Sequence, residues 1–83
     1  DYIFTTFPNP TSDFVKVETK DTNVMALAIY NTVGRLVYYE RIEDSEVNFQ
    51  RIIDMRNWQP GIYNIILHTF ENKFSSRILL YKD

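Results

Sequence analysis

The stretch Trp58-Gln59-Pro60-Gly61-Ile62-Tyr63 decides the fold, because it places a turn directly before a strand. Proline fixes φ and glycine can take a positive φ, so Pro60-Gly61 is typical of a turn. The residues from Ile62 to Phe70 then alternate as in a strand with one buried face. The link Glu71-Asn72-Lys73 leads into a last strand, Phe74 to Lys82. The chain is therefore expected to end in an antiparallel hairpin made of its two longest strands.

Strand patterns also recur through the first half of the chain, where no segment keeps a helical period. Phe14 to Glu18 alternates, with Val15 and Val17 on one face. Val24 to Tyr30 is an almost unbroken apolar run, which predicts a central strand covered on both faces. Helix is the rival for this run. The turn residues 31–34 and the β-forming run Leu36-Val37-Tyr38-Tyr39 favour a hairpin instead, with Gly34 in the left-handed position.

The remaining strands are marked less clearly. Tyr2 to Phe7 is an extended segment that ends at Pro8-Asn9-Pro10, where two prolines remove amide donors. The residues from Val47 to Ile53 predict a strand, and Gln50-Arg51 between its apolar pairs indicates a register break or bulge. Glu40 to Glu46 is charged and is expected to be a solvent-facing link. About seven short antiparallel strands predict an all-β fold, a two-sheet β-sandwich of Ig-like type without the Cys-Trp-Cys signature of antibody domains.

The composition predicts one small globular domain, residues 1–83. Six Phe, six Tyr and one Trp supply the apolar surface for a single core. Nine basic and eleven acidic residues give a net charge of −2 without a basic cluster, so no nucleic acid is expected as a partner. No apolar run approaches the ~20 residues that span a bilayer, so no membrane insertion is expected. The absence of cysteine excludes disulfides and thiolate chemistry.

The start of the chain gives one more expectation. It begins with Asp1 and shows no signal-peptide pattern. We therefore expect a fragment excised from a larger protein that has its own export signal.

Catalytic and metal sites can be considered for some residues of this sequence, but ordinary structural roles fit these residues better. His68 is the single histidine, and without cysteine only carboxylates remain to complete a metal site. Ser75 and Ser76 lie across the predicted hairpin from His68, and Asp54 is available, yet no strained nucleophile turn accompanies them. A glycosidase needs a pair of carboxylates in a cleft. The candidate carboxylates lie in a charged link for which no cleft is predicted: Glu40, Glu43, Asp44 and Glu46. No enzyme activity and no cofactor are expected.

The alternative function is that of a carbohydrate-binding or adhesive β-sandwich accessory module. Sugar-binding β-sandwiches stack aromatic rings on pyranose faces, and four aromatic residues are candidates here: Trp58, Tyr38, Tyr39 and Tyr63. The competing interpretation is that Tyr39 packs against neighbours on its own sheet face. Trp58 would then close one end of the core, with its N–H bonded to a backbone carbonyl.

The last hairpin is mildly basic within an acidic chain. It contains Lys73, Arg77 and Lys82. Charges on an edge strand discourage unwanted pairing between molecules. The same edge offers amides and carbonyls that a receptor could extend by strand addition. An exposed terminal strand would also allow a strand-exchanged homodimer.

Several motifs occur in the order found in one family. Pro8-Asn9-Pro10 resembles its Pro-Asn-Pro turn, and Ile29-Tyr30-Asn31 with Gly34-Arg35-Leu36-Val37 resembles its central hairpin. Gly61-Ile62-Tyr63 resembles its Gly-x-Tyr element, and Lys82 stands where the family places a terminal lysine. The chain departs from the pattern at Asp83 and at Ser75, Ser76 and Arg77, where lysines are often found. From Phe7 to Lys82 the chain resembles the Ig-like C-terminal sorting domains of the type IX secretion system.

This resemblance implies a noncatalytic secretion signal. Such domains direct a covalently linked upstream cargo from the periplasm through the outer-membrane type IX translocon, which reads the folded label. A sortase-like peptidase usually removes the label, here near or before Asp1, and the cargo is attached to the cell surface or released. The positions implied in recognition are Pro8, Asn9, Pro10, Gly34, Gly61, Tyr63, Arg77 and Lys82. Among them, Gly61 is expected to permit the turn, Tyr63 to anchor its strand, and the strand Arg77 to Lys82 to face the receptor.

Overall fold

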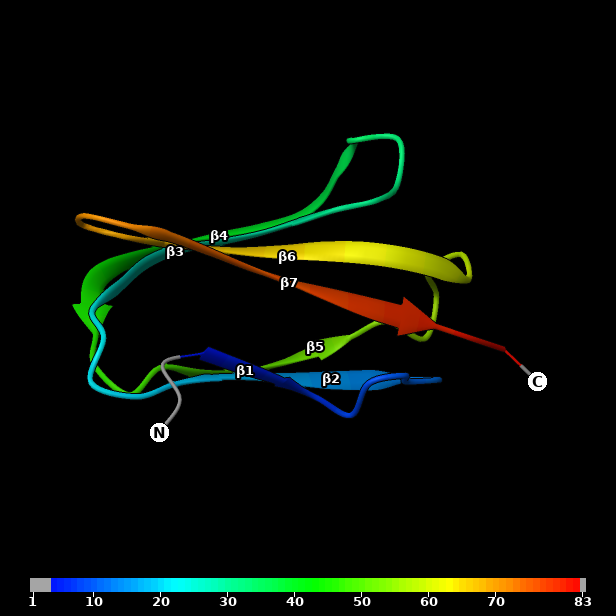
Figure 1. Ribbon diagram of the computed structural model, residues 1–83, viewed down its shortest axis with the longest axis horizontal. Coiled ribbons are helices and arrows are strands. Elements are labelled where there is room, and N and C mark those ends of the chain that lie inside the picture. The colour runs from blue at the N-terminus through cyan, green and yellow to red at the C-terminus, as the bar shows by residue number, and fades with distance from the viewer. Residues whose placement is uncertain (1–3, 83) are drawn as a thin grey trace.

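Two β-sheets face each other across a single core (Figure 1). The computed structural model describes residues 4–82, except for the side chains of residues 44–46. Tyr2 and Ile3 of the first predicted strand therefore lie outside the described residues. Within the described range the chain forms strands and no helix: β1 (Phe4–Phe7), β2 (Phe14–Thr19), β3 (Val24–Tyr30), β4 (Leu36–Glu46), β5 (Gln50–Asp54), β6 (Gly61–Thr69) and β7 (Lys73–Leu80). The all-β prediction is confirmed.

The strand order is that of an immunoglobulin-like sandwich with one strand moved. One sheet has the order β1-β2-β5 and the other has the order β4-β3-β6-β7, with antiparallel neighbours throughout. In immunoglobulin constant domains the fourth strand lies beside the fifth. Here β4 pairs with β3 instead, because the five-residue turn 31–35 brings the chain straight back along β3. The predicted two-sheet sandwich is confirmed.

The core lies between the sheets and is built from alternate residues of each strand. Val15 and Val17 of β2 point inward, as predicted, and are fully buried. Across from them lie the inward residues of the larger sheet, Leu27, Ile29, Ile65, Leu67, Ile78 and Leu80. The predicted central strand is β3, which lies between β4 and β6 and is buried on both faces from Ala26 to Ile29.

The prediction of a solvent-facing link over Glu40 to Glu46 is wrong. These residues belong to β4, whose 11 residues also make it longer than either strand of the last hairpin. The charge pattern misled the interpretation because β4 is an edge strand whose outer face meets solvent, where polar residues are tolerated. Among the residues of this segment whose side chains are described, Ile42 is the buried one. The pairing of β4 with β3 is irregular between Val24 and Ala26.

The strand predicted from Val47 to Ile53 is shifted. β5 begins at Gln50, and the expected register break at Gln50-Arg51 is wrong, because β2 and β5 pair without interruption. Phe49 precedes the strand but is fully buried. Its amide donates to Thr19 Oγ1 at 3.0 Å, and its carbonyl accepts from the Thr19 amide at 2.9 Å. Phe49 therefore fills the core from a loop that is bonded to the end of β2.

An ion pair joins the two sheets on the side of the sandwich formed by β4 and β5. Arg51 Nε lies 2.9 Å from Glu40 Oε2, and the Arg51 guanidinium also stacks 4.5 Å from the centre of the Phe49 ring. The Tyr38 hydroxyl donates to Glu40 Oε1 at 3.1 Å. Burial, followed by the neighbouring Glu40 charge, raises the pKa of Tyr38. This side of the core is thus closed by half-buried polar groups that bond to one another.

Candidate functional site

Most motif positions gather at one end of the sandwich, which we call the motif end. It consists of the β1–β2 turn (residues 8–13), the β3–β4 turn (31–35), the β5–β6 loop (55–60) and the tail after β7 (81–82) (Figure 1). Antiparallel strands alternate in direction, so alternate connections meet at the same end. Sequence motifs far apart along the chain are therefore neighbours in space.

The Pro-Asn-Pro turn closes part of the edge of β7. The Asn9 side chain donates from Nδ2 to the Arg77 carbonyl at 2.9 Å and accepts from the Leu79 amide at 3.1 Å. Thr11 continues the contact, donating its amide to the Leu79 carbonyl at 2.9 Å and accepting from the Tyr81 amide at 3.0 Å. We call residues 8–11 the edge strap, because they bond to β7 as a neighbouring strand would.

The edge strap changes the interpretation of the last strand. β7 is an edge strand of the larger sheet, as expected. However, the outward carbonyls of Arg77 and Leu79 and the outward amides of Leu79 and Tyr81 already have partners. Further along, Ser76 Oγ lies 2.9 Å from Thr6 Oγ1 of β1. The C-terminal half of this edge is therefore not open to strand addition in the folded domain.

Tyr63 ties the start of β6 to the loop before it. Its hydroxyl donates to the Gln59 carbonyl at 2.5 Å, and its ring lies 5.2 Å from the Trp58 ring between centroids. Only 5% of Tyr63 is exposed, and burial raises its pKa. A tyrosine at the start of the sixth strand that bonds back to the preceding corner is a hallmark of immunoglobulin-like sandwiches. The Gly-x-Tyr element is thus a structural corner.

Both motif glycines have the positive φ expected of them. Gly34 has φ +80° in the β3–β4 turn, and Gly61 has φ +149° as β6 begins. A Cβ atom at either position would meet no other atom within 4 Å. The requirement for glycine is therefore a matter of backbone conformation and not of space. In the first turn, Asn31 Oδ1 also accepts the amides of Val33 at 3.1 Å and Arg35 at 2.9 Å.

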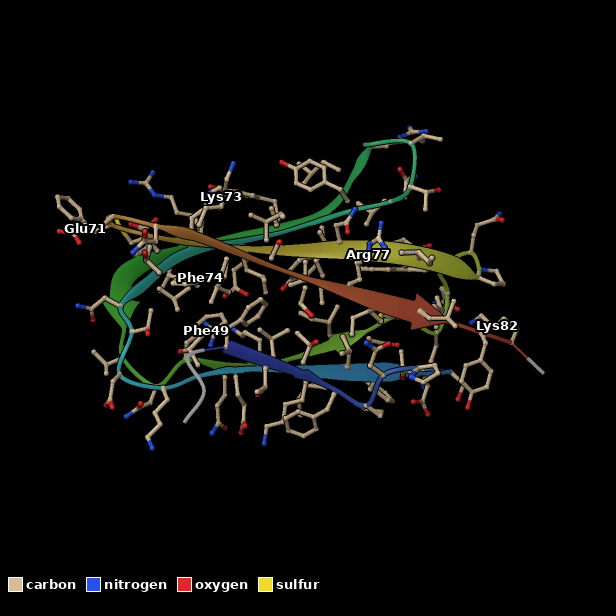
Figure 2. All side chains as sticks on the ribbon, viewed as in Figure 1. Phe49, Glu71, Lys73, Phe74, Arg77 and Lys82 are labelled. Carbon is tan, nitrogen blue, oxygen red and sulfur yellow. The ribbon has the colours of Figure 1, made fainter. Side chains whose placement is uncertain are left out.

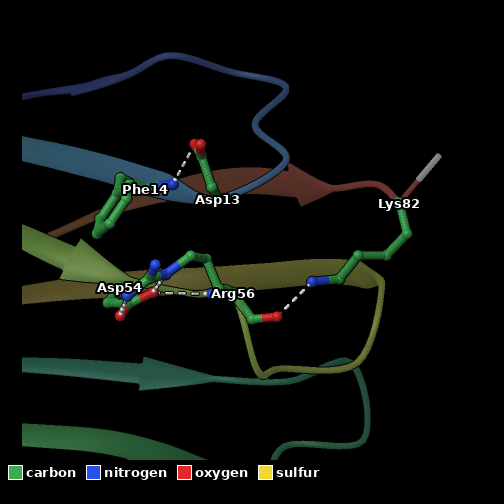
Figure 3. Close-up of polar contacts among 5 residues, drawn as sticks. All are labelled: Asp13, Phe14, Asp54, Arg56 and Lys82. Carbon is green, nitrogen blue, oxygen red and sulfur yellow. Dashed lines mark hydrogen bonds and ion pairs between the residues drawn. The ribbon is translucent and has the colours of Figure 1, made fainter.

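Lys82 follows the last strand and bonds to the β5–β6 loop. Its Nζ donates to the Arg56 carbonyl at 2.6 Å (Figure 3). The Arg56 guanidinium pairs with Asp54 at 2.8 Å and lies 4.9 Å from the centre of the Phe14 ring. The hydrogen bonds from Arg56 lower the pKa of Asp54 from 3.8 to about 2. The Met55 amide also donates to the Asp13 carbonyl at 2.8 Å, so the loop, the tail and the β1–β2 turn are bonded together.

Arg77 has a different environment. Its backbone carbonyl contacts Asn9, but its side chain is exposed on the outer face of the larger sheet, away from the core (Figure 2). Of the predicted site residues, the structure thus joins Asn9 to the backbone of Arg77 and links Lys82 to the loop that precedes Gly61 and Tyr63. Sequence reasoning missed Thr11, which is 2% exposed, because its partners lie about seventy residues away along the chain.

The rival catalytic sites are not assembled. His68 and Ser75 lie on the outer face of the larger sheet, Ser76 faces inward, and Asp54 is on the other sheet with Arg56 as its partner. Four acidic residues were candidates for a glycosidase carboxylate pair. Of these, Glu40 is bound to Arg51, and the side chains of Asp44 and Glu46 lie outside the described residues. Within residues 4–82, as far as side chains are described, no group of three or more His, Cys, Asp or Glu is placed to hold a metal ion.

The aromatic residues considered for sugar binding do not form a platform. Tyr63 is buried in its corner, Tyr38 bonds to Glu40 within the sandwich, and Trp58 is half-buried against Tyr63. Tyr39 is the exposed member of the set. This geometry gives no support to the carbohydrate-binding alternative. The part of the chain that the structure describes contains no helix with the length and apolar character to span a membrane.

Comparison with known proteins agrees with the arrangement of the motifs. The family model described as secretion system C-terminal sorting domain matches residues 5–81, which include almost all of the sandwich. No curated protein and no solved structure matches the chain significantly. The chain belongs to the family of secretion system C-terminal sorting domains, the sorting domains of type IX secretion.

Proposed function

We propose that this domain is a noncatalytic label that the outer-membrane type IX translocon reads in its folded form on a periplasmic cargo. The observation that carries the proposal is the family match over residues 5–81, which spans β2 to β7 completely and most of β1. The fold supports recognition of the folded domain by the translocon, because motif residues from distant parts of the chain come together only when the motif end forms.

Later steps follow the same proposal. A sortase-like peptidase removes the label, and the covalently linked cargo is then attached to the cell surface or released. In the described part of the domain, hydrogen bonds join the loops of the motif end, and the two sheets enclose one core. Both features suit a compact recognition module. Exchange of β7 between two copies would first have to break its bonds to the edge strap.

An export assay tests the proposal. The domain would be fused behind a periplasmic reporter in a bacterium with a working type IX apparatus and, in parallel, in a strain that lacks the translocon. We expect the reporter at the cell surface or in the medium only with the translocon present. The deletion of Gly61 to Asp83 should keep the reporter in the periplasm. Retention of the reporter with the intact, folded domain would contradict the proposal.

Removal of the label is measured on the same cells. We expect the mass of the exported reporter to be lower than that of the periplasmic reporter by about the mass of the domain, as determined by mass spectrometry. A strain without the sortase-like peptidase should export or accumulate the uncleaved form. An exported reporter that keeps the domain in the wild-type strain would contradict the processing step and leave the sorting step intact.

A further inference from the structure

The outer face of the larger sheet carries exposed apolar side chains. By register, Tyr39 of β4 and Ile66 of β6 lie on either side of Ala28, and Ile62 pairs with Leu79 of β7. Tyr39 is 56% exposed, Leu79 44% and Ile62 38%. A depression of about 440 Å³ lies over β6, lined by Tyr30, Asn64, Ile66, His68, Lys73 and Ser75 among others. This outer face is thus an uneven, partly apolar surface that no described element covers.

The same face carries cations that lack acidic partners. Arg41 of β4 and Lys73 and Arg77 of β7 occupy outward positions, and Figure 2 shows Lys73 and Arg77 pointing away from the core while Phe74 points into it. Among the described residues, none of these three cations forms an ion pair. The ion pairs that do form lie elsewhere, on the outer face of the smaller sheet, between the sheets and at the motif end: Lys16–Glu18, Arg51–Glu40 and Arg56–Asp54.

This distribution opposes the net charge of the chain. The protein carries a net charge of −2, yet three cations without an ion pair, Arg41, Lys73 and Arg77, stand on this one face, where Glu43 is the single acidic residue among the outward positions whose side chains are described. Unpaired cations next to exposed apolar side chains complement a surface that presents carboxylates among apolar groups. A phosphate-bearing surface would satisfy the cations but would offer little to Tyr39, Ile62 and Leu79.

We propose that the outer face of the β4-β3-β6-β7 sheet docks onto an acidic, partly apolar protein surface of the type IX machinery. The inference rests on the proposed sorting function and names the surface that is read. Lys73 and Arg77 pair with carboxylates of the partner, and Tyr39 and Ile66 pack against its apolar side chains. Docking uses the side chains of β7 and not its backbone edge, since the edge strap already occupies the C-terminal half of that edge.

Charge reversal on matched faces tests this surface. The double variant Lys73→Glu/Arg77→Glu changes the outer face of the larger sheet. Lys16→Glu/Lys20→Glu makes the same change in net charge, with Lys16 on the outer face of the smaller sheet and Lys20 in the turn after β2. Both variants should keep the melting temperature of the wild type within a few degrees, because Lys73 and Arg77 have no ion-pair partner to lose and the Lys16–Glu18 pair lost in the control is a surface pair that contributes little to stability. We expect export of the reporter to fall about tenfold or more for Lys73→Glu/Arg77→Glu and to remain near wild type for the control.

The outcomes separate this inference from the sorting function. If the wild-type domain fails to export the reporter, the sorting function itself fails. If the wild type is exported and both charge variants are exported equally well, the docking surface is wrong while the sorting function stands.

A binding measurement distinguishes a protein partner from a lipid one. The wild-type domain would be mixed with protein-free vesicles made from outer-membrane lipid that includes lipopolysaccharide, and with the purified translocon in detergent. We expect binding to the translocon that weakens with salt and is lost in Lys73→Glu/Arg77→Glu. Binding to the vesicles with the same variant dependence, and none to the translocon, would overturn the proposal in favour of an anionic lipid surface.

Discussion

At the scale of single residues, Tyr63 shows how a family motif can serve the fold. Its hydroxyl reaches the Gln59 carbonyl, four residues back, while its ring is buried beside Trp58. Gly61 between them has φ +149°, a conformation that other residues rarely adopt. The short spacing of the Gly-x-Tyr element is therefore explained by one local corner, without any contact to a receptor.

Removal of the Tyr63 hydroxyl should destabilise the domain. Tyr63→Phe keeps the buried ring but leaves the Gln59 carbonyl without its partner, so we expect a loss of about 1–3 kcal/mol in the free energy of unfolding. Tyr39→Phe is the matched control, because Tyr39 is exposed and has no hydrogen bond among the described residues. Urea unfolding of both variants measures the difference. Equal stability of the two would show that the corner bond contributes nothing.

Asp54 should make stability depend on pH. Its folded pKa of about 2 lies below its ordinary value of 3.8, mainly because Arg56 hydrogen-bonds the carboxylate. A lowered pKa means that the unfolded state binds the proton more readily, so this contribution is present above pH ~4 and is lost as the pH falls toward 2. Asp54→Asn should therefore flatten the fall in unfolding free energy between pH 4.5 and pH 2. If the unfolding free energies of the variant and the wild type fell in parallel with pH, the pH dependence could not be assigned to Asp54.

At the scale of elements, the edge strap and β7 behave as one unit. Edge strands expose a row of amides and carbonyls that attract other chains. Here the Asn9 amide group and the Thr11 backbone occupy the C-terminal half of that row. The outward amide of Ser75, two positions before Arg77 and on the same side of the strand, has no partner among the described residues. Protection of the edge is therefore confined to one half of β7.

Hydrogen exchange measures this difference directly. We expect the Leu79 and Tyr81 amides to exchange slowly and the Ser75 amide to exchange quickly, although Ser75 and Leu79 face the same edge. Asn9→Ala should speed exchange at Leu79 more than at Tyr81, because the Tyr81 amide donates to Thr11 and not to Asn9. Fast exchange at Leu79 in the wild type would mean that the edge strap does not hold β7 in solution.

At the scale of the whole molecule, the motif end and the outer face of the larger sheet differ in how their polar groups are bonded. The motif end fastens loops and tail together through Asn9, Tyr63 and Lys82. The outer face carries the unpaired cations Lys73 and Arg77. The proposed recognition of a folded label would need both, but a defect in each should have a different effect on export and stability.

Export and stability should therefore be linked at the motif end and independent on the outer face. For Tyr63→Phe, we expect export to fall only as far as the folded fraction falls at the growth temperature, and to recover when the cells are grown at a lower temperature. For Lys73→Glu/Arg77→Glu, we expect low export at every temperature with an unchanged folded fraction. Limited proteolysis of the periplasmic reporter gives the folded fraction. A temperature-dependent recovery in the charge variant would assign its defect to folding.

The local patterns of the sequence determined most of the strands, the turns and the family. Alternation placed Val15 and Val17 inside, and the need for positive φ placed Gly34 and Gly61 in turns, because both effects act over a few residues. Local patterns gave the wrong prediction for the Glu40 to Glu46 segment, since charge alone does not distinguish a loop from an edge strand with one solvent-exposed face.

Only the tertiary structure decided which groups meet. Asn9 bonds to β7 across 68 and 70 residues of sequence, and Thr6 meets Ser76 across 70. The order β4-β3-β6-β7 places Arg41, Lys73 and Arg77 on one outer face. Such contacts depend on which strands become neighbours, and that choice is made by burial of the common core and not by the residues on either side of each motif.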